Sequence, residues 1–172
     1  SEREQDLVAR VHRFLAAAGS LLGDTTRLAL NAVDIEKLER FIDRICHKEL
    51  SCGSGAGERV RFLAALTRDG VVAAGTSPWD LCEKIYLIDD EHGAVSGLLL
   101  AGIRRRALAS QYEVITCSCP MAPFGKIDHL LIPEAGVGFM TQNGIHPTFT
   151  SDLRHINSRR FMDMDTLGLR RQ

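Results

Sequence analysis

The chain has 172 residues, 45% of them hydrophobic, and 21 basic against 22 acidic side chains leave a net charge of −1. That balance gives no overall reason to expect nucleic acid as a partner, and no apolar run approaches the roughly 20 residues of a membrane span. Five cysteines, an odd number, do not suit a secreted disulfide framework, and no signal peptide is recognised, so we expect a cytoplasmic protein.

The first 50 residues predict two helices that pack on each other as a hairpin. Apolar residues recur at helical spacing in residues 2–22 and again toward residue 50. We expect Gly23 to end the first helix, Asp24 to cap the next helical stretch, and Asp34 to be an N-cap within that stretch. Two packed helices bury one stripe each, and we also expect an exposed apolar strip that a partner covers. Its residues, Ala16, Ala17, Leu28 and Leu30, lie off the main stripes, and the α/β domain is the alternative cover. The stripe residues are Leu7, Val11, Phe14, Ala18 and Leu21, then Leu38, Phe41, Ile42 and Ile45.

A small-residue segment, SCGSGAGE at 51–58, predicts a flexible linker and a domain boundary. Strand patterns then alternate with helical ones over residues 59–172. This alternation predicts an α/β domain with a mostly parallel sheet that is covered on its faces. The expected strands lie at 60–67, 84–89, 112–119, 129–133, 136–142 and 153–158, with a helix over 96–110.

The stretch DDEHGAVSGLLL at 89–100 joins a predicted strand to a predicted helix. A strand, a glycine-containing turn and a helix form the arrangement in which phosphate-binding loops occur. We therefore expect Val95 and Ser96 at a strand-to-helix turn, with the helix continuing to about residue 109.

The order of these segments resembles a poorly characterised bacterial family of tandem P-loop ATPase-like proteins. In that family, a helical hairpin joins two P-loop halves, so the resemblance implies a P-loop NTPase-like domain after the hairpin. It also implies an intact P-loop repeat of the same protein as a candidate partner. The matching stretches are FLAAAGSLLGD (14–24), DIEKLERFIDRI (34–45), RFLAALTRDGVV (61–72), KIYLIDDEHGAVSGLLL (84–100), YEVITCSCP (112–120), KIDHLLIPEAGVGFMT (126–141) and His146–Pro147.

The loop departs from the working P-loop pattern G-x-x-x-x-G-K-[ST]. Asp89 stands at the first glycine, Ala94 at the second and Val95 at the lysine, while Ser96 keeps the hydroxyl and Gly97 follows it. The lysine normally reaches the phosphates and the hydroxyl binds magnesium. Because acids precede Gly93 and no lysine follows it, we expect the loop to bind neither ATP nor magnesium usefully.

Two further groups of residues are candidates for chemistry. An Asp128–His129 pair, with His146, is a candidate for acid–base work at a sheet edge, although a capping turn is the favoured interpretation. Glu134 and Asp128 are the remaining candidates for an acidic magnesium ligand. Cys117 and Cys119 have the wrong spacing for zinc, and we expect no metal.

The sequence favours a non-catalytic, pseudo-ATPase module with an assembly or regulatory role, no cofactor, and a protein partner or a homo-oligomeric state. One alternative is an active ATPase or kinase with a nonstandard loop that uses ATP and magnesium. Another is a small-molecule enzyme that uses the edge around Asp128, His129 and His146. Identifying a ligand at that edge would favour the last alternative.

Overall fold

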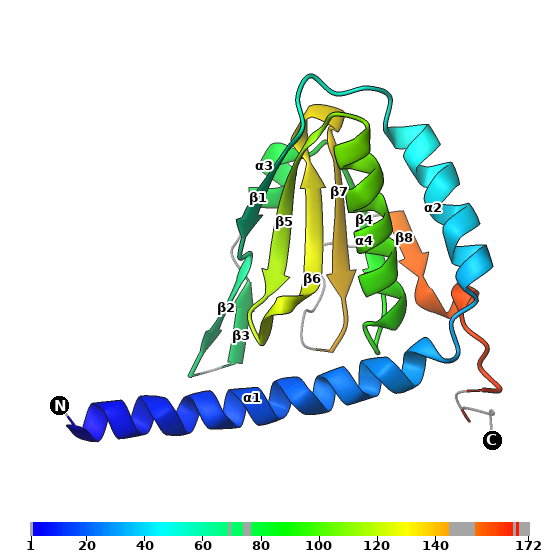
Figure 1. Cartoon of the computed structure of the whole chain (residues 1–172). Helices are drawn as coiled ribbons and strands as arrows, with labels where there is room; N and C mark the ends of the chain where they lie inside the picture. The colour runs from blue at the N-terminus through cyan, green and yellow to red at the C-terminus, as the bar shows by residue number, and fades with distance from the viewer. Residues whose placement is uncertain (1, 69, 74–76, 145–153, 167, 169–172) are drawn as a thin grey trace.

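One six-stranded sheet organises the chain, with strand order β1-β5-β6-β7-β4-β8 (Figure 1). The structure is a computed structural model that describes residues 2–68, 70–73, 77–144, 154–166 and 168. Neighbouring strands pair in parallel except at β6, which is antiparallel to both β5 and β7. The predicted α/β class with a mostly parallel sheet is therefore confirmed. The strands are β1 (Gly57–Arg61), β4 (Lys84–Asp89), β5 (Glu113–Cys119), β6 (Ala122–Ile132), β7 (Val137–Gln142) and β8 (Arg154–Asn157).

Two helices cover one face of the sheet. Helix α4 (Ala94–Ala109) lies on the strands, and helix α2 (Ile35–Glu49) lies outside it (Figure 1). Because α4 is enclosed by the sheet and α2, it is apolar on several sides and buries Leu99, Leu100 and Ile103 completely. The predicted helix over 96–110 is thus confirmed, two residues longer at its start.

A smaller apolar cluster lies on the other face of the sheet. It gathers Cys82, Ile85, Leu87, Leu131 and Met140, with Trp79 and Leu63 packed against it. Trp79 belongs to the short helix α3 (Ser77–Leu81). The predicted strand over 60–67 is split, because the chain leaves the sheet after β1. The later part, β2 (Ala64–Thr67), pairs with β3 (Gly70–Ala73) in a separate antiparallel hairpin.

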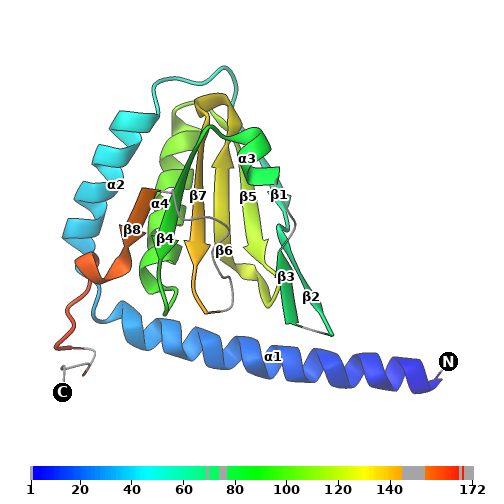
Figure 2. The same cartoon turned by 180° about the vertical axis from the view of Figure 1, so that it is seen from behind.

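Helix α1 (Glu2–Leu30) corrects the hairpin prediction. Both N-terminal helices are present, but α1 runs across the edge of the sheet where β4 and β7 end, and it diverges from α2 (Figures 1 and 2). The apolar face of α2 packs on α4 instead. Leu38, Ile42 and Ile45 of α2 belong to the same core cluster as the buried residues of α4. The expectation that the two helices pack on each other is therefore wrong.

The expected break inside α1 is also wrong. The helix continues through Gly23 and Asp24 to Leu30, and Asp24 forms an ion pair with Arg27 one turn later instead of capping a new helix. Asp34, in contrast, is the N-cap of α2, as predicted, because its carboxylate accepts from the Lys37 N–H at 2.9 Å.

The segment predicted as a flexible linker, 51–58, is held against the end of α4. The Gly53 N–H donates to the Ser110 carbonyl at 2.8 Å, and the Gly55 N–H donates to the Gln111 carbonyl at 2.9 Å. A Cβ on Gly53 would lie 2.2 Å from the carbonyl oxygen of Gln111. Glycine at this position therefore allows two backbone segments to be in direct contact. From composition alone, the same glycine predicts a flexible segment.

The remaining described elements are short. The 3-10 turn η1 (Pro133–Ala135) joins β6 to β7, and η2 (Ser158–Phe161) follows β8 and places Phe161 in the main core. None of the helices in the described ranges is both long and apolar enough to cross a membrane.

Candidate functional site

The turn between β4 and α4 lies at the edge of the sheet where the parallel strands end. Strand β4 stops at Asp89 and α4 begins at Ala94, so four residues form the turn. Gly93 precedes the helix with φ of 71°, a left-handed conformation that favours glycine. The predicted strand-to-helix turn is confirmed, but it precedes Val95 and Ser96, which already lie in the first turn of α4.

The carboxylate of Asp90 fills the start of α4. Asp90 is 1% exposed, and its Oδ2 accepts from the Ser96 N–H at 2.7 Å while its Oδ1 accepts from the His92 N–H at 3.3 Å. The first N–H groups of a helix have no partner within the helix and attract anions. Here the chain supplies that anion itself.

The residues at the P-loop glycine and lysine positions do not face a phosphate site. The Asp89 carboxylate hydrogen-bonds Nδ1 of His155, on the neighbouring strand β8, at 2.9 Å. Ala94 and Val95 are buried, and Val95 belongs to the main apolar core. A side chain at position 95 therefore points into the core in this structure.

Buried polar side chains gather around the start of α4. Ser96 Oγ and Thr141 Oγ1 are buried and lack a hydrogen-bond partner among the described residues. Asp128, at an irregularity in the β5–β6 pairing, is 1% exposed and forms an ion pair with Lys126 at 3.1 Å. The Lys126 side chain also passes over Gly93, because a Cβ there would lie 3.4 Å from its Cε. A lysine from β6 thus approaches the turn that lacks one of its own.

His129, the neighbour of Asp128, is also buried. Its Nδ1 accepts from the Thr141 N–H at 3.3 Å, which ties the ring to β7. The described structure therefore places both members of the predicted Asp–His pair near the carboxyl edge, but below the surface. The third member, His146, lies outside the described residues.

Glu134 does not belong to this site. It is exposed in η1, between the end of β6 and the start of β7. The neighbouring Gly136 carbonyl accepts from the Lys84 N–H at 2.9 Å, which places η1 beside the beginning of β4. Because β6 runs antiparallel, it carries the chain away from the edge that holds Asp128, so the two candidate acidic residues lie at opposite ends of the sheet.

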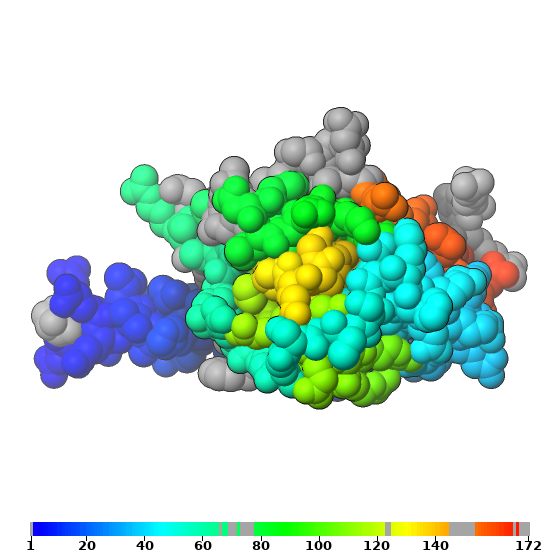
Figure 3. All heavy atoms as spheres, turned by 90° about the horizontal axis from the view of Figure 1, so that it is seen from above, coloured from blue at the N-terminus to red at the C-terminus, as the bar shows by residue number. Residues whose placement is uncertain are grey.

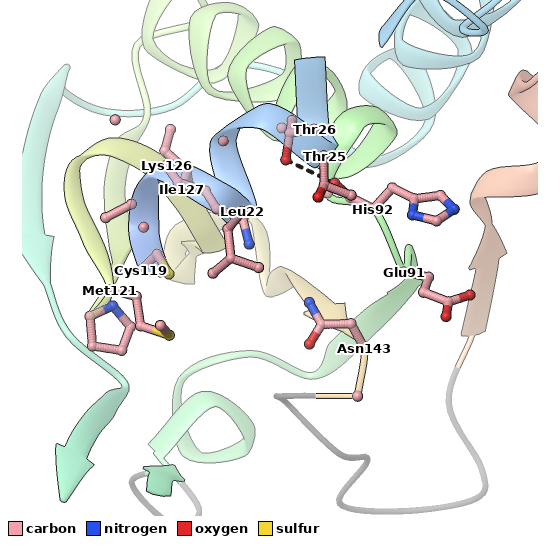
Figure 4. Close-up of a pocket in the computed structure, with 18 of the residues that line it drawn as sticks. Leu22, Thr25, Thr26, Glu91, His92, Cys119, Met121, Lys126, Ile127 and Asn143 are labelled. Atoms are coloured by element: carbon pink, nitrogen blue, oxygen red, sulfur yellow. Dashed lines mark hydrogen bonds between the residues drawn. The ribbon is translucent and has the colours of Figure 1, made fainter. Parts of the chain in front are cut away.

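A cavity of about 590 Å³ opens beside the turn, and α1 forms one wall of it (Figure 4). The Thr26 hydroxyl of α1 donates to the His92 carbonyl at 2.9 Å, which fastens the helix over the turn. The β5–β6 hairpin also contacts α1, because a Cβ on Gly19 would lie 3.0 Å from the carbonyl oxygen of Met121. The cavity is lined by α1, by the β4–α4 turn and α4, by the β5–β6 hairpin and by the end of β7. The lining residues include Leu22, Thr25, Glu91, Lys126, Ile127 and Asn143.

The role of α1 as a wall was missed by the sequence interpretation. Small and hydroxyl residues at Gly19, Gly23, Thr25 and Thr26 line the cavity on a helix that is otherwise rich in large apolar residues. This change from large to small residues within one helix was the signal in the sequence. It does not predict which element the small residues would face.

Three of the buried cysteines have thiols that are poor nucleophiles. Burial raises the pKa of the Cys46 and Cys82 thiols to about 11. Burial, followed by the nearby Asp128 carboxylate, raises the pKa of Cys117 to about 12. A thiol with so high a pKa is a weak nucleophile near neutral pH. Within the described ranges, no three His, Cys, Asp or Glu side chains are grouped closely enough to hold a metal ion.

Comparisons of the chain with protein-family models, curated proteins and solved structures gave no significant match.

Proposed function

We propose that the chain is a non-catalytic module of the P-loop NTPase-like type that serves assembly rather than nucleotide hydrolysis. The observation that carries the proposal is the Asp90 carboxylate, which accepts from the Ser96 N–H where a P-loop would present its N–H groups to a phosphate. The four-residue turn between Asp89 and Ala94 has the length of the x-x-x-x segment of a P-loop, which supports the type. In this turn, however, a carboxylate of the chain itself occupies the N–H group that a phosphate would bind.

The charges around the turn also oppose a triphosphate. Asp90 and Asp128 are buried carboxylates there, and Glu91 lines the cavity. Two like charges about 4 Å apart repel by roughly 4 kcal/mol at an effective dielectric of about 20. Among the described lining residues, Lys126 is the only lysine or arginine, and it is already paired with Asp128. Phosphoryl transfer depends on stabilising negative charge, so this balance disfavours the active-ATPase alternative.

Calorimetric titration with ATP and magnesium tests the proposal directly. We expect no heat of binding from the unmodified chain up to millimolar nucleotide, and no ATPase activity. Micromolar binding that is lost in Ser96→Ala would contradict the proposal. The control is Ser110→Ala, the same chemical change at the C-cap of α4, the opposite end of that helix from the site.

The cavity favours a second candidate, the binding of a small molecule other than a triphosphate. Its volume of about 590 Å³ falls in the range of roughly 300–1,000 Å³ that is usual for ligand pockets. This candidate differs from the small-molecule alternative at Asp128 and His129, because neither of those residues lines the cavity. Leu22 and Ile127 contribute apolar walls instead.

A fluorescent apolar anion, 8-anilinonaphthalene-1-sulfonate, tests this second candidate. Gly97 lines the cavity and has open space where a Cβ would stand, so Gly97→Leu should fill the cavity and reduce dye binding at least tenfold. Gly55→Leu is the control, since Gly55 also has open space but lies outside the cavity. Equal dye binding by both variants would remove the cavity as the binding site.

A further inference from the structure

Helix α1 carries a row of large apolar side chains spaced seven residues apart. Leu7, Phe14, Leu21 and Leu28 are 61%, 72%, 68% and 71% exposed, respectively. Val11, Ala18 and Thr25 fall between them, so the row repeats with steps of four and three residues. A 4-3 repeat over three heptads, apolar here at every position except Thr25, is the pattern of a two-stranded coiled coil.

The four large apolar members of the row lie on a different side of the helix from the residues that contact the sheet edge. Thr25, between two of them, also lines the cavity. Thr26 and Ala29 face the chain's own fold, one through its bond to His92 and the other by burial. Residues 2–14 are all exposed, and this part of α1 projects beyond the rest of the molecule (Figure 3). A projecting helix of this length is marginal in water unless its apolar face is covered.

We propose that the exposed row of α1 pairs with the same row of a second copy in an antiparallel coiled coil. Setting Phe14 opposite the partner's Ala18 matches a large side chain with a small one. The same alignment sets Val11 opposite the partner's Leu21. It also brings Arg10 beside the partner's Asp24, and the symmetry of the pair repeats each contact.

Charge decides between the two directions. In a parallel pair in register, the flanking contacts of Arg3 and Arg10 would be the partner's Val8 and the partner's Leu15, which offer no opposite charge. The antiparallel pair supplies two Arg10–Asp24 contacts and also opposes the two helix dipoles favourably. This inference rests on the assembly role proposed above and names its partner.

Sedimentation and light scattering test the pairing. We expect the unmodified chain at tens of micromolar to show twice its mass of 19.0 kDa, and Phe14→Asp to weaken the dimer at least tenfold. Phe62→Asp is the matched control, because Phe62 is 55% exposed but lies outside α1. Trp79 fluorescence and the thermal midpoint verify that each variant folds. A monomer at these concentrations, or a dimer that Phe14→Asp leaves intact, overturns the proposal.

Charge reversal tests the direction. Arg10→Glu and Asp24→Lys should each weaken self-association at least tenfold, because each sets like charges against each other. Mixing the two variants should restore a heterodimer, since each then meets its complement. Arg27→Glu controls for the ion pair within the helix that Asp24→Lys removes. Single variants that dimerise as tightly as the unmodified chain would sink the antiparallel arrangement.

Nucleotide titration on the same preparations keeps the two proposals separable. A monomer that does not bind ATP would overturn only the coiled coil. A dimer that binds ATP at micromolar concentration would overturn only the non-catalytic assignment.

Discussion

A buried carboxylate, Glu49, ties the end of α2 to strand β4. Its Oε1 accepts from the Tyr86 hydroxyl at 2.5 Å and its Oε2 accepts from the Lys84 ammonium at 2.9 Å, while Lys48 lies 3.3 Å away. Burial alone would raise the pKa of Glu49, but the hydrogen bonds from these three side chains outweigh it and hold the pKa below 4.5. The depressed pKa means that Glu49 stabilises the fold above about pH 4.5, and that this contribution is lost as the pH falls through the folded-state pKa.

Replacing Glu49 by glutamine should lower stability at neutral pH and flatten the acid dependence. The loss should be about 1.5–3 kcal/mol, the range for hydrogen bonds to a charged group. Thermal midpoints measured from pH 7 to pH 3 should converge for the variant and the unmodified chain at the acid end. Glu83→Gln, at an exposed neighbouring position, should change little. Parallel curves for Glu49→Gln and the unmodified chain would show that another group causes the acid dependence.

Restoring the lysine of the P-loop pattern, Val95→Lys, should strongly destabilise the fold rather than create a nucleotide site. Val95 has no exposed surface and belongs to the main core, so the ammonium would lose its water without gaining a partner. An uncompensated buried charge costs about 3–5 kcal/mol. Ala109→Lys, exposed at the end of the same helix, is the control in chemical denaturation. A Val95→Lys protein that folds normally and binds ATP would show that position 95 faces the turn.

Residue types predicted local features well and long-range ones poorly. Asp34 was identified as a cap because its neighbours in sequence are the groups it caps. Asp90 was counted only as a like charge near phosphate, since its burial depends on the turn folding back over it. The separation of Glu134 from Asp128 could not be predicted, because strand direction is set by pairing partners, which the local sequence does not contain.

At the scale of elements, the backbone of the 51–58 segment lies directly against the backbone that follows α4. Gly53→Ala should cost about 1–3 kcal/mol, the usual range for overpacking, because the added Cβ would meet the backbone of Gln111 and Tyr112. Gly55→Ala is the matched control, since nothing lies within 4 Å of its Cβ position. Urea unfolding of both variants measures the difference. Equal midpoints would show that the segment moves freely, as its composition suggested.

The elements themselves were predictable where their periodicity was strong. Strand β4 was predicted with its observed bounds, and the start of α4 was predicted to within two residues. Both were predictable because a glycine-containing turn separates an apolar β-strand pattern from a helical pattern. Helix α1 was cut short at Gly23, where the helix in fact continues. A glycine within a helix costs only about 1 kcal/mol, which contacts along the rest of the helix can offset.

At the scale of the whole molecule, the predicted boundaries of an N-terminal unit (1–50), a linker (51–58) and a domain (59–172) stay a prediction. Helix α2 is where they can be tested. Leu38, Ile42 and Ile45 lie in the same core cluster as Leu99 and Ile103 of α4. Removing α2 would expose that face of α4 to water. We therefore expect α2 and the sheet to unfold together, in one cooperative transition.

Hydrogen exchange resolves this element by element. Amides of α2, such as those of Ile42 and Ile45, should exchange with the same free energy of opening as that of Leu87 in β4, because both require global unfolding. Amides within residues 2–14 should exchange fast in dilute protein and more slowly as the concentration rises, since the coiled coil would protect them. The concentration series is its own control, because α2 and β4 should not respond to it. If α2 exchanges well before β4, residues 1–50 behave as a separate unit, and the packing of α2 on α4 contributes far less stability than its buried side chains imply.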